Sequence, residues 1–150
     1  AHFRQPVSRY NNIDVDKNIV RLLDTGSDQN PAGLAPADLL HFHKRELNGF
    51  RDDVTAYHQL MIDIVDAQAK SLSLVLNGAP VKQLYVDGGF SRNGLYMYLL
   101  STRFPHIEIY AASMAQATAI GAALAVHHAW NHQPLPENLI TIQKWQLISR

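Results

Sequence analysis

Apolar side chains recur at helical spacing over one long stretch, which is the strongest periodic signal in the chain. The apolar positions that follow the i, i+3, i+4, i+7 spacing are Tyr57, Leu60, Met61, Ile64, Val65, Leu72, Val75 and Leu76. Acidic positions such as Asp63 fall off this stripe. Asp52 or Asp53 can cap the start, and Asn77-Gly78 can end the helix. We therefore predict an amphipathic helix that starts after Asp52 or Asp53 and carries its apolar stripe from Tyr57 to Leu76.

The pattern changes after this helix. Gln83–Val86 is short and β-prone, and Ile107–Tyr110 alternates as a second strand. Between them, Asn93 can cap a helix from Gly94 to about Arg103, which Pro105 ends. Ala115–Trp130 is then a long helix of small residues. Strand, helix, strand and helix in this order favour a parallel sheet with covering helices.

The two ends of the chain are less regular. Turn-forming residues dominate the first 36 positions, and the apolar cluster Ile19–Leu23 is short. Pro36 can open a helix over Ala37–Leu47. Near the other end, Ile140–Ile148 is either an edge strand or a packed extension.

Composition then narrows the class of protein. Lys and Arg number 13, as do Asp and Glu, so this neutral chain has no electrostatic reason to bind nucleic acid or an anionic membrane. Hydrophobic residues make up 47%, which is typical of a globular domain. The absence of cysteine excludes disulfides and thiolate sites. The apolar stretch Ala119–Val126 is far shorter than a span of about 20 residues. No signal-like segment opens the sequence, so we predict a cytoplasmic protein.

Val86–Asn93 is the most informative segment, because a strand ends there in two glycines and a helix follows. Gly88 and Gly89 allow a sharp turn and present no Cβ to a flat or anionic ligand. Free N–H groups at the helix start, with the side chains of Ser91 and Asn93, suit a nucleotide base or phosphate. The alternative is that the glycines form a tight connection and nothing more.

A second segment, Met114–Ala125, is almost free of large side chains. Gly121 costs this helix about 1 kcal/mol relative to alanine. Close backbone packing beneath a ligand loop would offset that cost. The alternative is a small-residue packing helix with no ligand nearby.

Together these segments resemble the C-terminal domain of the FGGY carbohydrate kinases, within the actin-like ATPase superfamily. The order of a long helix, a strand ending in Asp-Gly-Gly, a helix, a strand and an Ala-Ile-Gly-Ala-Ala helix is similar over Tyr57–Leu76, Leu84–Asn93 and Ile107–Ala125. The resemblance implies an α/β lobe of the actin-like, ribonuclease H-like type, with a mixed sheet and covering helices.

The resemblance also implies the organisation of the chain. Residues 56–131 would form the nucleotide-binding core, residues 1–55 an irregular N-terminal region and residues 132–150 a C-terminal extension. Such a lobe would bind ATP with Mg²⁺. A separate N-terminal lobe would bind the sugar, a ketose or polyol of the xylulose, rhamnulose, fuculose or glycerol type, and supply the catalytic aspartate. A second copy of the chain is a further candidate partner.

Carried over by position, the resemblance implies that Gly88 and Gly89 line the ATP site and that Asn93 approaches the adenine. Phe90 and Ser91 occupy variable positions between them. Asp87 matches the family acid, and we expect it to hold the turn rather than to bind a metal. Outside this loop Gln116 departs from the pattern, since many members carry Glu there.

Other features lack the pattern of a site. We find no phosphate loop upstream, and we expect Asp14, Asp16, Asp24 and Asp28 to be solvated surface residues. The sequence therefore predicts no catalytic residue and no metal site within this chain, and the chain alone is not a complete catalyst.

The histidines provide only a weak signal. His41 and His43 point about 200° apart on a helix, whereas His128 and His132 could share a metal only if their helix continued past Asn131.

A rival interpretation is a non-catalytic α/β interaction module. Its Gly-Gly turn would be structural, and its Ala-rich helix would form an interface.

Overall fold

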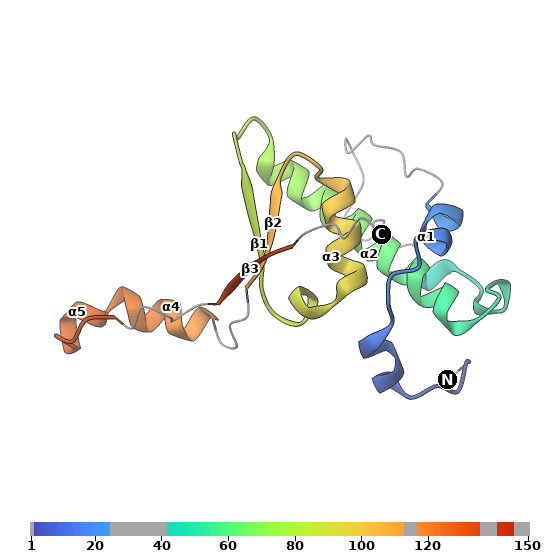
Figure 1. Cartoon of the computed structure of the whole chain (residues 1–150), viewed down its shortest axis with the longest axis horizontal. Helices are drawn as coiled ribbons and strands as arrows, with labels where there is room; N and C mark the ends of the chain where they lie inside the picture. The colour runs from blue at the N-terminus through green and yellow to red at the C-terminus, as the bar shows by residue number, and fades with distance from the viewer. Residues whose placement is uncertain (1, 25–41, 113–116, 136–140, 146–150) are drawn as a thin grey trace.

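The structure, a computed structural model, describes residues 2–24, 42–112, 117–135 and 141–145. Figure 1 shows a small sheet with helices α2 (Asp53–Leu76) and α3 (Gly94–Arg103) packed on one side of it. Helices α4 (Ala117–Ala125) and α5 (His127–Trp130) extend away from the rest of the molecule (Figure 1). The predicted α/β class is thus confirmed at the level of helices on a mixed sheet.

The sheet has three strands in the order β1-β2-β3. Strand β1 (Gln83–Val86) pairs in parallel with β2 (Glu108–Ala112), with Leu84 opposite Ile109. Strand β3 (Ile142–Lys144) pairs antiparallel with β2, which makes the sheet mixed. The β-α-β unit is therefore confirmed. Of the two alternatives for residues 140–148, the described part forms an edge strand over Ile142–Lys144.

The outer face of the sheet is polar and aromatic. Tyr85 and Tyr110 lie opposite each other on β1 and β2 and stack with ring centroids 5.1 Å apart. Lys144 of β3 binds Glu108, and hydrogen bonds from Lys144, Tyr110 and Gln83 lower the pKa of Glu108 to about 2. Cross-strand side-chain pairs thus link all three strands on this face.

Helix α2 begins as the sequence predicts. The Asp52 carboxylate accepts hydrogen bonds from the Thr55 backbone N–H (2.7 Å) and hydroxyl (2.6 Å), which is the N-cap geometry. After Leu76, Gly78 adopts a φ of 74° and the helix does not resume. The predicted apolar stripe extends too far, because Val75 is 77% exposed.

The core lies between α2, α3 and the sheet. Val65 of α2 is fully buried, as are Leu95 and Leu99 of α3, and Ile109 of β2 packs with them. Each buried aliphatic side chain stabilises the fold by about 1.5–3 kcal/mol. This packing sets the position of α3 relative to β2, and therefore the position of the loop that precedes α3.

A short helix, α1 (Lys17–Leu23), was not predicted, since its apolar run is brief. The Asp16 carboxylate caps it by accepting from the backbone N–H groups of Asn18 and Ile19. The Asp16 backbone N–H also donates to Nε2 of His58, a fully buried residue of α2. These tertiary contacts hold in place a helix too short to be stable alone.

The positions off the apolar stripe of α2 form a second packing surface. Arg103 of α3 donates to Asp66 (2.7 Å) and to both carboxylate oxygens of Asp24 (2.9 and 3.0 Å). Asp63, only 5% exposed, accepts two hydrogen bonds from Arg45. The expectation that Asp24 is a solvated surface residue is therefore wrong, because Asp24 ties the end of α1 to α3.

The helix predicted over residues 37–47 is not found in its described part. Two 3₁₀ turns, η3 (Phe42–Lys44) and η4 (Leu47–Gly49), replace it, and residues 37–41 lie outside the described residues. Phe42 stacks on Phe50, with ring centroids 6.0 Å apart. Side-chain contacts with the rest of the chain thus decide the path of this segment rather than helical propensity.

The long helix predicted over residues 115–130 is also interrupted. Val126 has φ −106° and ψ 6°, outside the helical range, and separates α4 from α5. Residues 115 and 116 lie outside the described residues. In the described part of the chain, no helix has the length and apolar character needed to cross a bilayer.

The core packing predicts that truncation of two different leucines has very different effects on stability. We expect Leu99→Ala to lower the free energy of unfolding by about 2–5 kcal/mol, because Leu99 is fully buried in the core and the change would leave a cavity there. Leu74→Ala makes the same chemical change on a side chain that is 72% exposed and should cost less than about 0.5 kcal/mol. Urea denaturation of both variants measures the difference, and equal midpoints would contradict this assignment of the core.

The α2 cap predicts a loss of stability in acid. Hydrogen bonds from Thr55, and a weaker one from Arg51, lower the pKa of Asp52 from its ordinary 3.8 to about 2. Because the folded state binds this proton less tightly than the unfolded chain, the stabilisation is present above about pH 4 and is lost as the pH falls towards 2.

Asp52→Ala should therefore lower the free energy of unfolding by about 1 kcal/mol at neutral pH. The difference from the parent should shrink between about pH 4 and pH 2. Urea denaturation across this range measures it, with Asp14→Ala on an exposed residue as the control. A difference that stayed constant with pH would show that the carboxylate charge does not stabilise α2.

Candidate functional site

The candidate loop lies at the carboxyl end of β1, next to its parallel neighbour β2. Gly88 has φ 78° and ψ −156°, a conformation that is essentially restricted to glycine. A 3₁₀ turn, η5 (Gly89–Arg92), follows, and Asn93 leads into α3. Of the two adjacent glycines, Gly88 alone has a positive φ, so it makes the corner that the sequence predicts.

The corner is open. A Cβ built on Gly88 or on Gly89 would meet no atom within 4 Å. The Phe90 ring stacks on Tyr96 of α3, with centroids 4.6 Å apart, and remains 45% exposed. No side chain of the described residues therefore plugs the corner, and main chain is accessible at both glycines.

Ser91 rather than Asp87 stabilises the turn. The Ser91 hydroxyl donates to the carbonyl of Gly88 over 2.8 Å, and Ser91 is 6% exposed. Asp87 is exposed, and its side chain has no hydrogen bond or ion pair within the described part of the chain. The expectation that Asp87 holds the turn is therefore wrong.

Asn93 is fully engaged with the protein. Its Oδ1 accepts from the Tyr96 backbone N–H over 3.0 Å and so caps α3. Its Nδ2 donates to the Tyr57 hydroxyl over 2.6 Å. This side chain therefore joins α2 to the start of α3, and contact between Asn93 and an adenine stays a prediction.

A cavity of about 300 Å³ adjoins the loop. Residues from η5, from the end of β2 and from around β3 line it: Ser91, Arg92, Ala111, Ala112, Thr141, Gln143 and Trp145. The Trp145 Nε1–H is buried and has no hydrogen-bond partner among the described residues. A buried donor without a partner costs about 1–3 kcal/mol. Because Nε1 has almost no accessible surface, a ligand in the cavity would contact the Trp145 ring rather than this N–H.

Sequence reasoning missed Gln143 and Trp145. They reach the loop because β3 pairs with β2, and the Trp145 backbone N–H donates to the carbonyl of Ile109. The available signal was the apolar alternation near the end of the chain, but it does not show which strand is the neighbour.

Helix α4 does not lie beneath the loop. A Cβ built on Gly121 would meet no atom within 4 Å, and most described side chains of α4 are exposed. The expectation that close backbone packing offsets the cost of Gly121 is therefore wrong for the described contacts. Gln116, where the sequence departs from the FGGY pattern, lies outside the described residues.

His128 and His132 do not lie on one helix. Helix α5 ends at Trp130, so His132 lies beyond it. His127 packs edge-on against Trp130 and is 7% exposed. The described residues contain no group of three or more His, Asp or Glu side chains arranged to hold a metal ion. His41 lies outside the described residues.

No protein-family model, curated protein or solved structure matches the chain. The resemblance to the FGGY carbohydrate kinases therefore depends on the motifs and their order, and the family and the activity stay predictions.

The loop geometry predicts that substitution of Gly88 destabilises the protein, whereas substitution of Gly89 has little effect on its stability. We expect Gly88→Ala to lower the free energy of unfolding by about 1–3 kcal/mol, because alanine is strained at φ 78°. Gly89→Ala should change it by less than about 0.5 kcal/mol, since Gly89 has no positive φ and its Cβ would meet open space. Chemical denaturation measures both. Equal losses would mean that the corner is not formed by Gly88.

Proposed function

We propose that this chain is the C-terminal, ATP-binding lobe of a sugar kinase resembling the FGGY carbohydrate kinases. The observation that supports the proposal is the open Gly88-Gly89 corner beside a cavity at the carboxyl end of a parallel strand. Open α/β sheets bind ligands at this position. The order of β1, α3 and β2 around the loop also agrees with the resemblance.

The groups around the corner suit the adenosine end of a nucleotide. Exposed main chain at Gly88-Gly89 permits close approach of a flat base. The Trp145 side chain lines the cavity and offers an aromatic surface to the base, and Arg92 offers an exposed cation for a phosphate. Ser91 holds the turn through Gly88, which keeps the corner in its open form.

Mg²⁺ does not fit these residues as a separate ligand set. No Asp or Glu lines the cavity beside the loop. Mg²⁺ prefers carboxylate, phosphate and water oxygens, so in the proposed enzyme it would be bound by the phosphates of ATP and by groups outside this cavity. We assign no step of the reaction to the metal here.

The sugar and the catalytic base belong to the N-terminal lobe in this proposal. Helix α4 supports the need for a further surface, because its sequence is entirely apolar apart from Thr118 and its described side chains are largely exposed. A helix that is apolar all round is normally buried. In the intact kinase, closure of the two lobes would align the γ-phosphoryl of ATP with a hydroxyl of a ketose or polyol.

The second candidate function is the non-catalytic interaction module. The exposed apolar surface of α4 and the engagement of Asn93 with Tyr57 favour it. In that case α4 would form an interface, with a second copy of the chain as one candidate partner, and the glycine corner would have no ligand. Nucleotide binding distinguishes the two functions, because the interaction module requires none.

The decisive experiment is calorimetric titration of the chain with ADP, which tests the adenosine end alone. The parent should bind ADP, and Gly89→Val should weaken binding at least about tenfold, because its side chain would project into the open corner. Gly49→Val is the matched control, since a Cβ there also meets no atom within 4 Å and Gly49 lies in η4.

A second variant tests the contribution of the cavity to ADP binding separately from that of the glycine corner. Trp145→Phe replaces the indole that lines the cavity with a smaller ring, so ADP affinity should fall about three- to tenfold if the ligand packs against the indole. Asn93→Ala is unsuitable, because loss of the α3 cap would cost about 1 kcal/mol of stability. If the parent binds no ADP, or if Gly89→Val binds as well as the parent, the assignment of this loop is wrong.

A further inference from the structure

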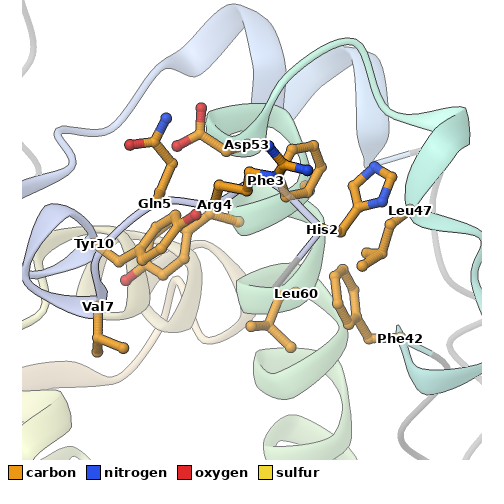
Figure 2. Close-up of a pocket in the computed structure, with 12 residues that line it drawn as sticks. His2, Phe3, Arg4, Gln5, Val7, Tyr10, Phe42, Leu47, Asp53 and Leu60 are labelled. Atoms are coloured by element: carbon orange, nitrogen blue, oxygen red, sulfur yellow. The ribbon is translucent and has the colours of Figure 1, made fainter.

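A second cavity, of about 470 Å³, has a lining that includes no residue of the candidate loop. It is formed where the N-terminal segment crosses the first turns of α2 and the 3₁₀ turns near residue 42. Its apolar lining includes Phe3, Val7, Tyr10, Phe42, Leu47 and Leu60 (Figure 2), together with Ala56 and Tyr57. The volume lies within the range of about 300–1,000 Å³ that is typical of small-molecule sites.

The aromatic rings of this wall are held by their neighbours. Tyr10 stacks on Tyr57 with ring centroids 5.4 Å apart, and the Tyr57 hydroxyl accepts from Asn93. Phe42 is likewise stacked on Phe50. Rings fixed in this way favour a flat apolar body in the cavity, because little side-chain freedom is lost on binding.

Of two charged side chains that line the cavity, the acidic one is paired within the described residues and the basic one is not. Asp53 is already neutralised, because Arg9 donates two hydrogen bonds to its carboxylate (2.5 and 3.3 Å) and lowers its pKa. Arg4 lines the same cavity, is exposed and has no hydrogen bond or ion pair within the described part of the chain. Figure 2 shows Arg4 with Phe3 and Asp53 on one side of the cavity and Leu60 and Phe42 on the other.

The backbone supports a specific placement of Arg4. Its φ of 51° is the one positive value at a non-glycine residue in the described part of the chain. Residues other than Gly, Asn and Asp rarely adopt this conformation, and such outliers gather at functional sites. Arg4 combines this backbone conformation with a position in the lining of the cavity, where the Asp53 carboxylate already has Arg9 as its partner.

We propose that this cavity binds a small aromatic carboxylate, with its ring between Tyr10, Phe42 and Leu60 and its anionic group on Arg4. A guanidinium recognises carboxylates through a planar fork of donors, which adds geometry to charge complementarity. The proposal is independent of nucleotide binding, since the lining residues do not include the glycine corner.

The test compares 2-naphthoate with its uncharged analogue 2-naphthamide in calorimetric titrations of the full chain. Naphthoate should bind at least about tenfold more tightly than the amide. Arg4→Gln should abolish this preference and leave naphthoate at the affinity of the amide. Arg21→Gln removes the same charge from an exposed position on α1 and should leave the preference unchanged.

A variant of the wall tests the apolar contribution separately. Phe42→Ala should weaken both probes by a similar factor of about five or more, because it removes a ring from the cavity without changing its charge. Circular dichroism confirms that each variant keeps the helical content of the parent, so that a loss of binding is not a loss of folding.

Several results would overturn the proposal. Equal binding of the two probes would show that Arg4 does not select an anion, and an equal effect of Arg21→Gln would indicate non-specific attraction. Absence of naphthoate binding at about 1 mM would exclude the small-molecule site. If sedimentation then showed a dimer that Phe42→Ala dissociates, the occupant would be a second copy of the chain.

Discussion

Burial of α3 between α2 and the sheet is the constraint on which the rest of the structure depends. Leu95 and Leu99 are completely shielded, and their neighbours come from both a helix and a strand. Because β1 leads into the loop and α3 leaves it, this packing fixes both ends of the segment between Val86 and Asn93. The glycine corner is therefore presented by a rigid frame, even though its own main chain is open to solvent.

Polar contacts complete the frame where apolar packing ends. His58 accepts a hydrogen bond from the Asp16 backbone N–H at the start of α1. Arg103 joins the end of α1 to α2 through Asp24 and Asp66. The members of such buried or half-buried networks depend on each other, because removal of one partner leaves a desolvated group behind. Helix α2 consequently has two packing surfaces, one apolar and one polar.

Periodicity, together with cap and turn residues, predicted α2, β1, α3 and β2. It could not show where Trp145 goes, because only the pairing of β3 with β2 places this residue beside the loop. Asn93 illustrates a different limit, since its type suits both a ligand and an N-cap, and Tyr57 decides its orientation from 36 residues away. Spacing thus predicts local structure well, whereas the use of a polar side chain depends on distant partners.

Helix α4 differs from the other long helices because its sequence is almost uniformly apolar around the axis. The sequence of an amphipathic helix determines how the helix is rotated about its own axis, since only its apolar side can be buried. Here Gly121 and the surrounding alanines permit close approach from any direction and select none. A surface that covers α4 must therefore determine which side of the helix faces it, in addition to burying the helix.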